Sequence, residues 1–309
     1  MAKFKIWRWE KAFLILFIIT YAVFAYGTDN SSLSQVTAFK IDYFQWKEYV
    51  PSQLPEYNDV IVSENGPLYH LILTWNWHDK TRLGCEINTD VFWGNPEYIY
   101  HDYSTTLDTI LTVFSSTQYV GMNVGIVFKL DFEKIAIGRM VFSLTPNAGI
   151  KYLGWKRSIP WYDLYVRNAG YIGYTGADEY WNTFLPTVGV QLTQYISTKI
   201  KLSIDLNGSI FGYVLERSDI NNSSIDHYRF DVHPELHSYF DGKANFSIGC
   251  FLIGITASRI AYRASEIAYI PQDNADRLQP ASIADYYGLT FGYTFPIFKS
   301  IVNGNSYRH

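Results

Sequence analysis

Apolar and polar residues alternate with a period of two along most of the chain, from about Ala38 to Phe295. Successive side chains of a β-strand point to opposite faces, so this period predicts strands with one apolar and one polar face. The segment 200–210 shows the pattern most clearly. Its apolar face would carry Ile200, Leu202, Ile204, Leu206, Gly208 and Ile210, and its polar face Lys201, Ser203, Asp205, Asn207 and Ser209.

The alternation predicts about ten strands. An irregular pattern in the ninth predicts a β-bulge. Pro186 interrupts the sixth, which is tolerable only near a strand end or a bulge. The expected strands cover residues 38–48, 67–77, 82–93, 120–131, 144–155, 184–192, 200–210, 240–248, 251–263 and 287–295.

Short and long connections alternate between these strands. Short ones are expected near 78–80, 133–140, 196–199 and 249–251, and long ones near 50–66, 94–117, 156–182, 215–235 and 264–284. An even strand number with this asymmetry predicts a single transmembrane antiparallel up-and-down β-barrel, with short periplasmic turns, long extracellular loops and a periplasmic N-terminus. A soluble β-sandwich is the alternative, but its strands are usually nearer ~5–6 residues than the ~9–11 that cross a membrane.

Composition agrees with a membrane barrel. Aromatic residues make up 18% of the chain, with 26 Tyr and 9 Trp, and transmembrane barrels place such residues in two interfacial girdles. A net charge of −4 gives no basic surface for nucleic acid. The seven His residues show no metal-site spacing. We therefore expect no nucleic-acid partner, no cofactor and no metal.

The N-terminal segment predicts export. Four cationic residues within the first eleven precede an apolar run over 12–24 and a plausible cleavage point after Ala25. A membrane anchor is the alternative, but the run is shorter than the ~20 residues that span a bilayer. We expect a signal peptide over 1–25, a barrel domain over 26–298 and a short C-terminal tail over 299–309.

Two motifs and the order of strands and loops resemble one known family. The run ENGPLY at 64–69 opens the second strand, and the run ADYYGLTFGYTF at 284–295 ends the last. Together they are similar to the omptin-like superfamily of ten-stranded outer-membrane β-barrels, over essentially the whole chain after the signal peptide. The resemblance implies an outer-membrane location and contact with lipid, including lipopolysaccharide. Omptins themselves are proteases that activate a water between an Asp-x-Asp pair and an Asp-x-His pair across an external cleft.

Only one half of that protease motif is present. Asp231 and His233 lie in the fourth long connection, just after Asp226 and His227, and Asp102 lies in the second. The spacing puts Asp231 and His233 on one face, the polar one if the register of the following strand holds, where they would orient a general base. Because no Asp-x-Asp pair stands opposite, three functions stay open. These are a structural or surface-binding barrel, an omptin-like endopeptidase using Asp/His-activated water, and a small-solute pore.

The polar face predicts a narrow, charged lumen. A barrel of about ten strands is only slightly wider than the ~8-stranded kind that side chains fill, so an interior ionic network is expected rather than a wide channel. The charged residues concerned are Lys40, Asp42, Arg82, Glu86, Asp90, Lys129, Asp131, Lys151, Lys201, Asp205, Asp241 and Lys243.

Two further partners are expected. Aromatic residues crowd the long connections, where they either bind a surface ligand or fold over the mouth. The last strand, ending at Phe295, would be recognised by the barrel-assembly machinery. The connection aromatics are Tyr98, Tyr100, Tyr103, Trp161, Tyr162, Tyr165, Tyr171, Tyr174, Tyr180 and Trp181.

Overall fold

A computed structural model describes most of the expected barrel domain. The described residues are 32–49, 60–78, 82–104, 109–138, 140–159, 162–166, 170–174, 176–220, 228–270, 275–277 and 279–298. The expected signal peptide and C-terminal tail lie outside them. Within these ranges no helix is long and apolar enough to cross a membrane.

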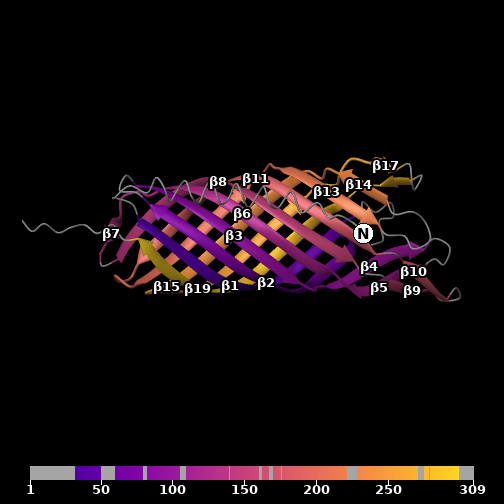
Figure 1. Cartoon of the computed structure of the whole chain (residues 1–309), viewed down its shortest axis with the longest axis horizontal. Helices are drawn as coiled ribbons and strands as arrows, with labels where there is room; N and C mark the ends of the chain where they lie inside the picture. The colour runs from indigo at the N-terminus through magenta and orange to yellow at the C-terminus, as the bar shows by residue number, and fades with distance from the viewer. Residues whose placement is uncertain are drawn as a thin grey trace, which may run out of the picture.

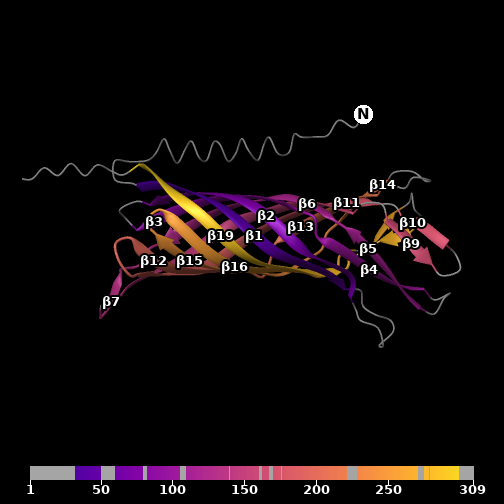
Figure 2. The ribbon, with the colours of Figure 1, turned by 90° about the horizontal axis from the view of Figure 1, so that it is seen from below.

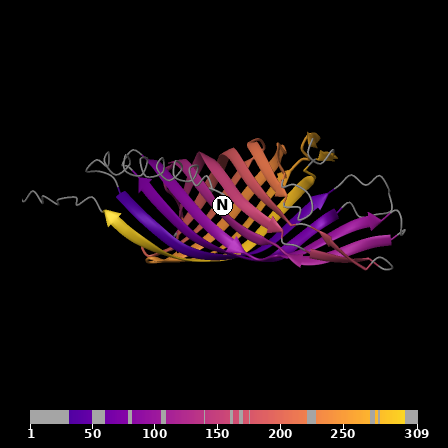
Figure 3. The ribbon, with the colours of Figure 1, turned by 45° about the vertical axis from the view of Figure 1, so that its right-hand side comes forward.

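Ten long antiparallel strands close into a barrel, as the alternation predicts (Figures 1 and 3). Each pairs with its neighbour along the chain, and the last pairs with the first over Ser34–Tyr49 and Ala281–Pro296. In order around the barrel they are β1 (Ser32–Tyr49), β2 (Val60–His78), β3 (Leu83–Gly94), β6 (Gln118–Leu130), β8 (Met140–Ile159), β11 (Ala177–Tyr195), β12 (Ile200–Ser209), β15 (Leu236–Ile248), β16 (Phe251–Tyr262) and β19 (Ala281–Phe298).

The apolar side chains of these strands face outward. On β8, Ile150 is 64% exposed whereas the inward Asn147 is 7% exposed. The five apolar side chains predicted for the last strand are all exposed, which confirms its two faces. Towards one end the outward positions become polar, at Gln45 on β1 and Lys156 on β8. A belt of outward apolar residues therefore surrounds the barrel and stops before that end.

Four smaller hairpins extend this end, which we call the loop end (Figure 2). They are β4 (Glu97–Ser104) with β5 (Thr109–Ser116), β9 (Tyr162–Val166) with β10 (Gly170–Tyr174), β13 (Tyr213–Ile220) with β14 (Tyr228–Val232), and β17 (Ala268–Ile270) with β18 (Ala275–Arg277). β4 and β13 also pair with barrel strands β2 and β11, so the wall continues beyond the apolar belt.

Short connections join the strands at the opposite, turn end. Gly249 turns the chain between β15 and β16 with φ of 59°, a left-handed conformation that favours glycine. The connection between β6 and β8 carries a short strand, β7 (Ile135–Ile137), which prolongs the wall at this end (Figure 2).

Pro186 lies where the neighbouring strand is interrupted. β11 pairs with β13 up to Phe184 and with β12 from Val188, and residues 210–212 between those two strands are irregular. A proline lacks the N–H that a strand interior needs, so it is tolerated at this gap in the ladder.

The bulge expected in the ninth strand lies instead in its partner. Opposite β16, the register shifts between Leu236 and Ser238 of β15, which leaves His237 as an extra residue. A bulge reverses which residues face inward. Before it the buried residues are Val232 and Leu236, and after it they are Tyr239 and Asp241.

Candidate functional site

The interior of the barrel turns from polar to aromatic towards the loop end. Trp46, Trp155, Trp181 and Tyr262, which we call the aromatic layer, meet at its centre and are at most 6% exposed. The ring centroids of Trp155 and Trp181 lie 5.8 Å apart with the planes at 10°. Trp181 meets Trp46 edge to face at 5.2 Å. These are the separations at which aromatic pairs attract one another.

Buried aliphatic and aromatic side chains surround the aromatic layer from strands all around the wall. Because these residues come from β1, β2, β3, β6, β8, β11, β13, β15, β16 and β19, the layer is packed on its sides by the barrel wall. The surrounding residues are Phe44, Leu68, Phe92, Tyr119, Leu153, Leu185, Val214, Leu236, Tyr239, Ile260 and Ala284.

A buried arginine lies directly on the loop-end side of the aromatic layer. Nη1 of Arg157 donates to Oε1 of Glu48 and to Oε2 of Glu179, both at 2.7 Å, and Nε donates to Oε1 of Glu64 at 2.7 Å. The arginine is 1% exposed. We call these four residues the Arg157 cluster. It ties β8 to β1, β2 and β11 at one level of the barrel.

The Arg157 cluster also holds the aromatic layer. Nε1 of Trp46 donates to Glu48 Oε1 at 2.9 Å, and Nε1 of Trp181 donates to Glu179 Oε2 at 3.4 Å. A buried indole N–H needs such a partner, and these bonds fix the orientation of both rings. The layer and the cluster therefore form one packed unit.

A fourth carboxyl group lies beside this unit without a cation of its own. Glu216 on β13 is fully buried and accepts a 2.7 Å hydrogen bond from Ser218 Oγ, while its Oε2 has no partner among the described residues. Burial, together with the nearby carboxylate of Glu179, raises the pKa of Glu216 well above its ordinary value. The residue lies beyond the apolar belt, on a hairpin strand of the loop end.

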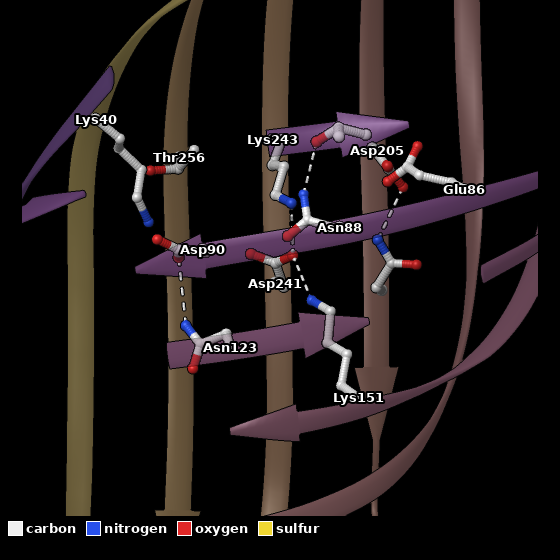
Figure 4. A network of polar contacts seen from close by, with 12 residues as sticks. Lys40, Glu86, Asn88, Asp90, Asn123, Lys151, Asp205, Asp241, Lys243 and Thr256 are labelled. Carbon is white, nitrogen blue, oxygen red and sulfur yellow. Dashed lines mark hydrogen bonds and ion pairs between the residues drawn. The ribbon is translucent and has the colours of Figure 1, made fainter. Parts of the chain in front are cut away.

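Below the aromatic layer the inward side chains form the ionic network that the polar face predicts (Figure 4). The His70 ring lies between two carboxylates, with Nδ1 2.9 Å from Asp90 Oδ1 and Nε2 3.1 Å from Asp42 Oδ2. Lys40 contacts Asp42 at 2.7 Å, and Asn123 donates to Asp90 at 3.3 Å. This group lies just under the layer, where Phe92 packs on His70.

Two further ion-pair groups continue the network towards the turn end. Lys151 and Lys243 approach Asp241 from two sides at 3.1 and 3.3 Å (Figure 4). Lys129 contacts Glu86 at 2.6 Å. The lumen charges are thus largely compensated within the barrel.

These side chains line a cavity of ≈ 460 Å³. It begins among residues near the turn end, such as Ser34, His78 and Lys201, and ends against Phe92, Tyr286 and Trp155, the last of which belongs to the aromatic layer. The cavity is therefore blind on the loop-end side.

The structure places Asp231 and His233 on the outer surface. Asp231 and His233 share a face, as expected. The polar inner face was expected only if the register of the following strand held, and it does not hold, because the bulge at His237 reverses it and the pair faces outward. Val232 between them is buried. Asp231 Oδ1 and Oδ2 accept from Arg217 Nε and Nη2 at 2.6 and 2.7 Å. This pairing holds the pKa of Asp231 below its ordinary value.

Less can be said of the other three candidates. Asp226 and His227 lie outside the described residues. Asp102 lies in β4, opposite Leu111 of β5. His233 Nδ1 lies 3.3 Å from the carbonyl oxygen of Val214. Within the described ranges, no group of three or more His, Cys, Asp or Glu is arranged to hold a metal.

Several residues of the observed sites were not singled out from sequence. Arg157 and Trp46 are among them, and Trp181 was assigned to a surface loop although it is fully buried. A signal existed: Asp42, Phe44, Trp46 and Glu48 share one parity on the first strand. Because Asp42 belongs to the polar inner face, the same parity places the rings of Phe44 and Trp46 inside the barrel.

The fold and these sites define a closed ten-stranded barrel with an outward apolar belt and a packed interior. No protein-family model and no curated protein matches the chain. Solved structures do match it. The outer-membrane protease OmpT of Escherichia coli aligns over 87% of this chain and 98% of its own, with a TM-score of 0.59 and 11% identity. The two share a fold, which confirms the expected omptin-like barrel architecture.

Other outer-membrane barrels match less closely. A major outer-membrane protein of Thermus thermophilus has a TM-score of 0.35 at 12% identity and covers 83% of this chain and 99% of its own. Ail, the attachment invasion locus protein of Yersinia pestis, has a TM-score of 0.30 at 8% identity, over 85% of this chain and 99% of its own. These two add no argument about this chain.

Proposed function

We propose that this chain is an outer-membrane β-barrel whose lumen is closed towards the cell surface and whose hairpins present a binding surface outside. The observation that carries the proposal is the aromatic layer, which fills the barrel beneath the Arg157 cluster. A barrel closed in this way does not function by letting solutes pass through its lumen. Its function is then carried by the surface of the wall and the hairpins at the loop end.

The outward belt supports the membrane location. Phe39, Leu71, Ile150 and Val188 are each at least 40% exposed. Apolar side chains in a continuous ring lower the free energy of a barrel in lipid, and in water they would leave a large surface to aggregate. A closed barrel also satisfies every backbone group of its strands, as a lipid environment requires.

The orientation follows from the two ends. Outer-membrane barrels keep short turns in the periplasm and longer segments outside. The turn end would therefore be periplasmic, and the hairpins at the loop end would be extracellular.

Surface labelling tests this arrangement. In a background with Cys85→Ala and Cys250→Ala, single cysteines are introduced at Ser116 near the loop end and at Glu133 near the turn end, both of which are exposed. Intact cells are treated with a membrane-impermeant maleimide. The proposal expects labelling of Ser116→Cys in intact cells and of Glu133→Cys only after the outer membrane is permeabilised. The reverse pattern, or recovery of the protein in a soluble fraction, would overturn it.

A further inference from the structure

The blind cavity below the aromatic layer has the properties of a small-molecule site. Its ≈ 460 Å³ fall within the range of about 300–1,000 Å³ that such sites occupy. Trp155, Tyr239, Tyr286 and Phe92 form an aromatic surface at its closed end. Polar side chains form the walls down to the turn end, which leaves that end as the way in.

Most of the charged side chains on the walls are already paired with one another. Lys151 and Lys243 share Asp241, Lys129 contacts Glu86, and Lys40 contacts Asp42. A charged ligand would have to compete with these partly buried pairs, and separating one is costly because it leaves an uncompensated charge. A neutral ligand avoids that cost.

The same walls offer many unused hydrogen-bonding positions. A lysine has three donors and a carboxylate about four acceptor positions, of which each ion pair uses only a part. Asn88 and Asn123 also line the cavity; each amide nitrogen donates one hydrogen bond, to Thr74 and Asp90, and has a second N–H. Thr290 is 7% exposed, and its Oγ1 has no hydrogen-bond partner among the described residues. Donors and acceptors therefore both face the cavity.

We propose that this cavity binds a neutral sugar or polyol, of monosaccharide to disaccharide size, that enters from the turn end. Each hydroxyl of such a ligand both donates and accepts, which matches walls where lysines and carboxylates alternate. The apolar C–H face of a sugar ring suits the aromatic end of the cavity. Since the aromatic layer closes the other side, the site holds its ligand and does not pass it on.

Matched variants on one strand test the proposal. Ser203 lines the cavity and is 8% exposed, whereas its neighbour Ile204 faces outward and is 41% exposed. Ser203→Phe fills cavity space, and Ile204→Phe adds a ring of the same type to the lipid-facing side. Both are refolded in a detergent without a sugar headgroup, and their heat-modifiable gel mobility shows that each barrel has closed.

Binding is measured by titration calorimetry with trehalose and glucose, and with the charged analogues glucose 6-phosphate and glucosamine. We expect saturable binding of trehalose or glucose by the native barrel and by Ile204→Phe, and a loss of about tenfold or more in affinity in folded Ser203→Phe. We expect both charged analogues to bind more weakly than glucose.

Three results would overturn the proposal. The first is no saturable binding of either neutral sugar by the folded native barrel, which would leave the cavity as a water-filled space. The second is equal binding by Ser203→Phe, which would place the sugar elsewhere. The third is tighter binding of glucose 6-phosphate or glucosamine than of glucose, which would make the cavity an ion site.

Discussion

Arg157 on β8 and Glu179 on β11 lie opposite each other in the register of the two strands, and Nη1 of the arginine donates to Oε2 of the glutamate at 2.7 Å. The same guanidinium reaches Glu48 and Glu64. One side chain therefore joins three other strands immediately above the aromatic layer. The arginine therefore holds four strands together at this level of the barrel.

Replacing this arginine should destabilise the barrel. Arg157→Ala leaves three carboxylates buried around an empty space, and breaking a buried ion pair from one side costs about 3–5 kcal/mol. We expect a lower unfolding temperature, measured by heat-modifiable gel mobility. The control is Lys156→Ala on the neighbouring outward position, where the half-exposed contact with Asp178 contributes at most about 1 kcal/mol. Equal stability of both variants would contradict the role assigned to Arg157.

Glu216 should make stability depend on pH. Its pKa is raised in the folded state, so its stabilising contribution is complete below the ordinary pKa of a glutamate and is lost as the pH rises through the raised value. Glu216→Gln keeps the hydrogen bond from Ser218 without the charge. We expect the variant to unfold at a higher temperature than the native chain at pH 8 and at a similar one at pH 4. A variant less stable than the native chain at pH 8 would show that the charged form is favoured.

Asp231 and His233 should not support peptide cleavage in the observed arrangement. Asp231 is engaged by Arg217 in two hydrogen bonds, and the pair faces away from the interior. We expect no cleavage of fluorogenic peptide libraries by refolded barrel with added lipopolysaccharide. Cleavage that disappears in both Asp231→Ala and His233→Ala would contradict this prediction and establish an omptin-like hydrolase.

A charged side chain introduced into the outward apolar belt should hinder folding of the barrel into lipid. Ile150 is 64% exposed on the belt, and an arginine facing the middle of the bilayer costs about 2–4 kcal/mol. We expect Ile150→Arg to reduce the yield of folded barrel in lipid vesicles. The control is Gln45→Arg, on an outward position beyond the belt, which should fold like the native chain. Equal yields would contradict the placement of the belt in lipid.

The barrel could be predicted from the sequence. Its wall faces lipid on one side and polar side chains on the other, so apolar and polar residues must alternate along each strand with a period of two. The outward face of the last strand, from Tyr287 to Phe295, is the plainest case. The strand bounds were less accurate: β2 begins at Val60, well before the predicted start at Pro67. Beyond the belt the strands are no longer in contact with lipid, so the pattern that reveals them weakens.

The candidate site was harder to predict because it depends on registers. One extra residue, His237, turns Asp231 and His233 outward, and the strand pattern did not reveal where that bulge lies. The Arg157 cluster joins Glu48, Glu64 and Glu179, which are far apart in the chain. Only the pairing of β1, β2, β8 and β11 brings these charges to one level.

The claim that the lumen is closed can be tested most directly by electrical conductance across planar lipid bilayers. The native barrel is compared with a variant in which Trp46 and Trp181, the centre of the aromatic layer, are both replaced by alanine, after both have been shown to fold. With a closed lumen, we expect no steady ion current through the native barrel and a measurable current through the double variant. A steady current through the native barrel would contradict the claim.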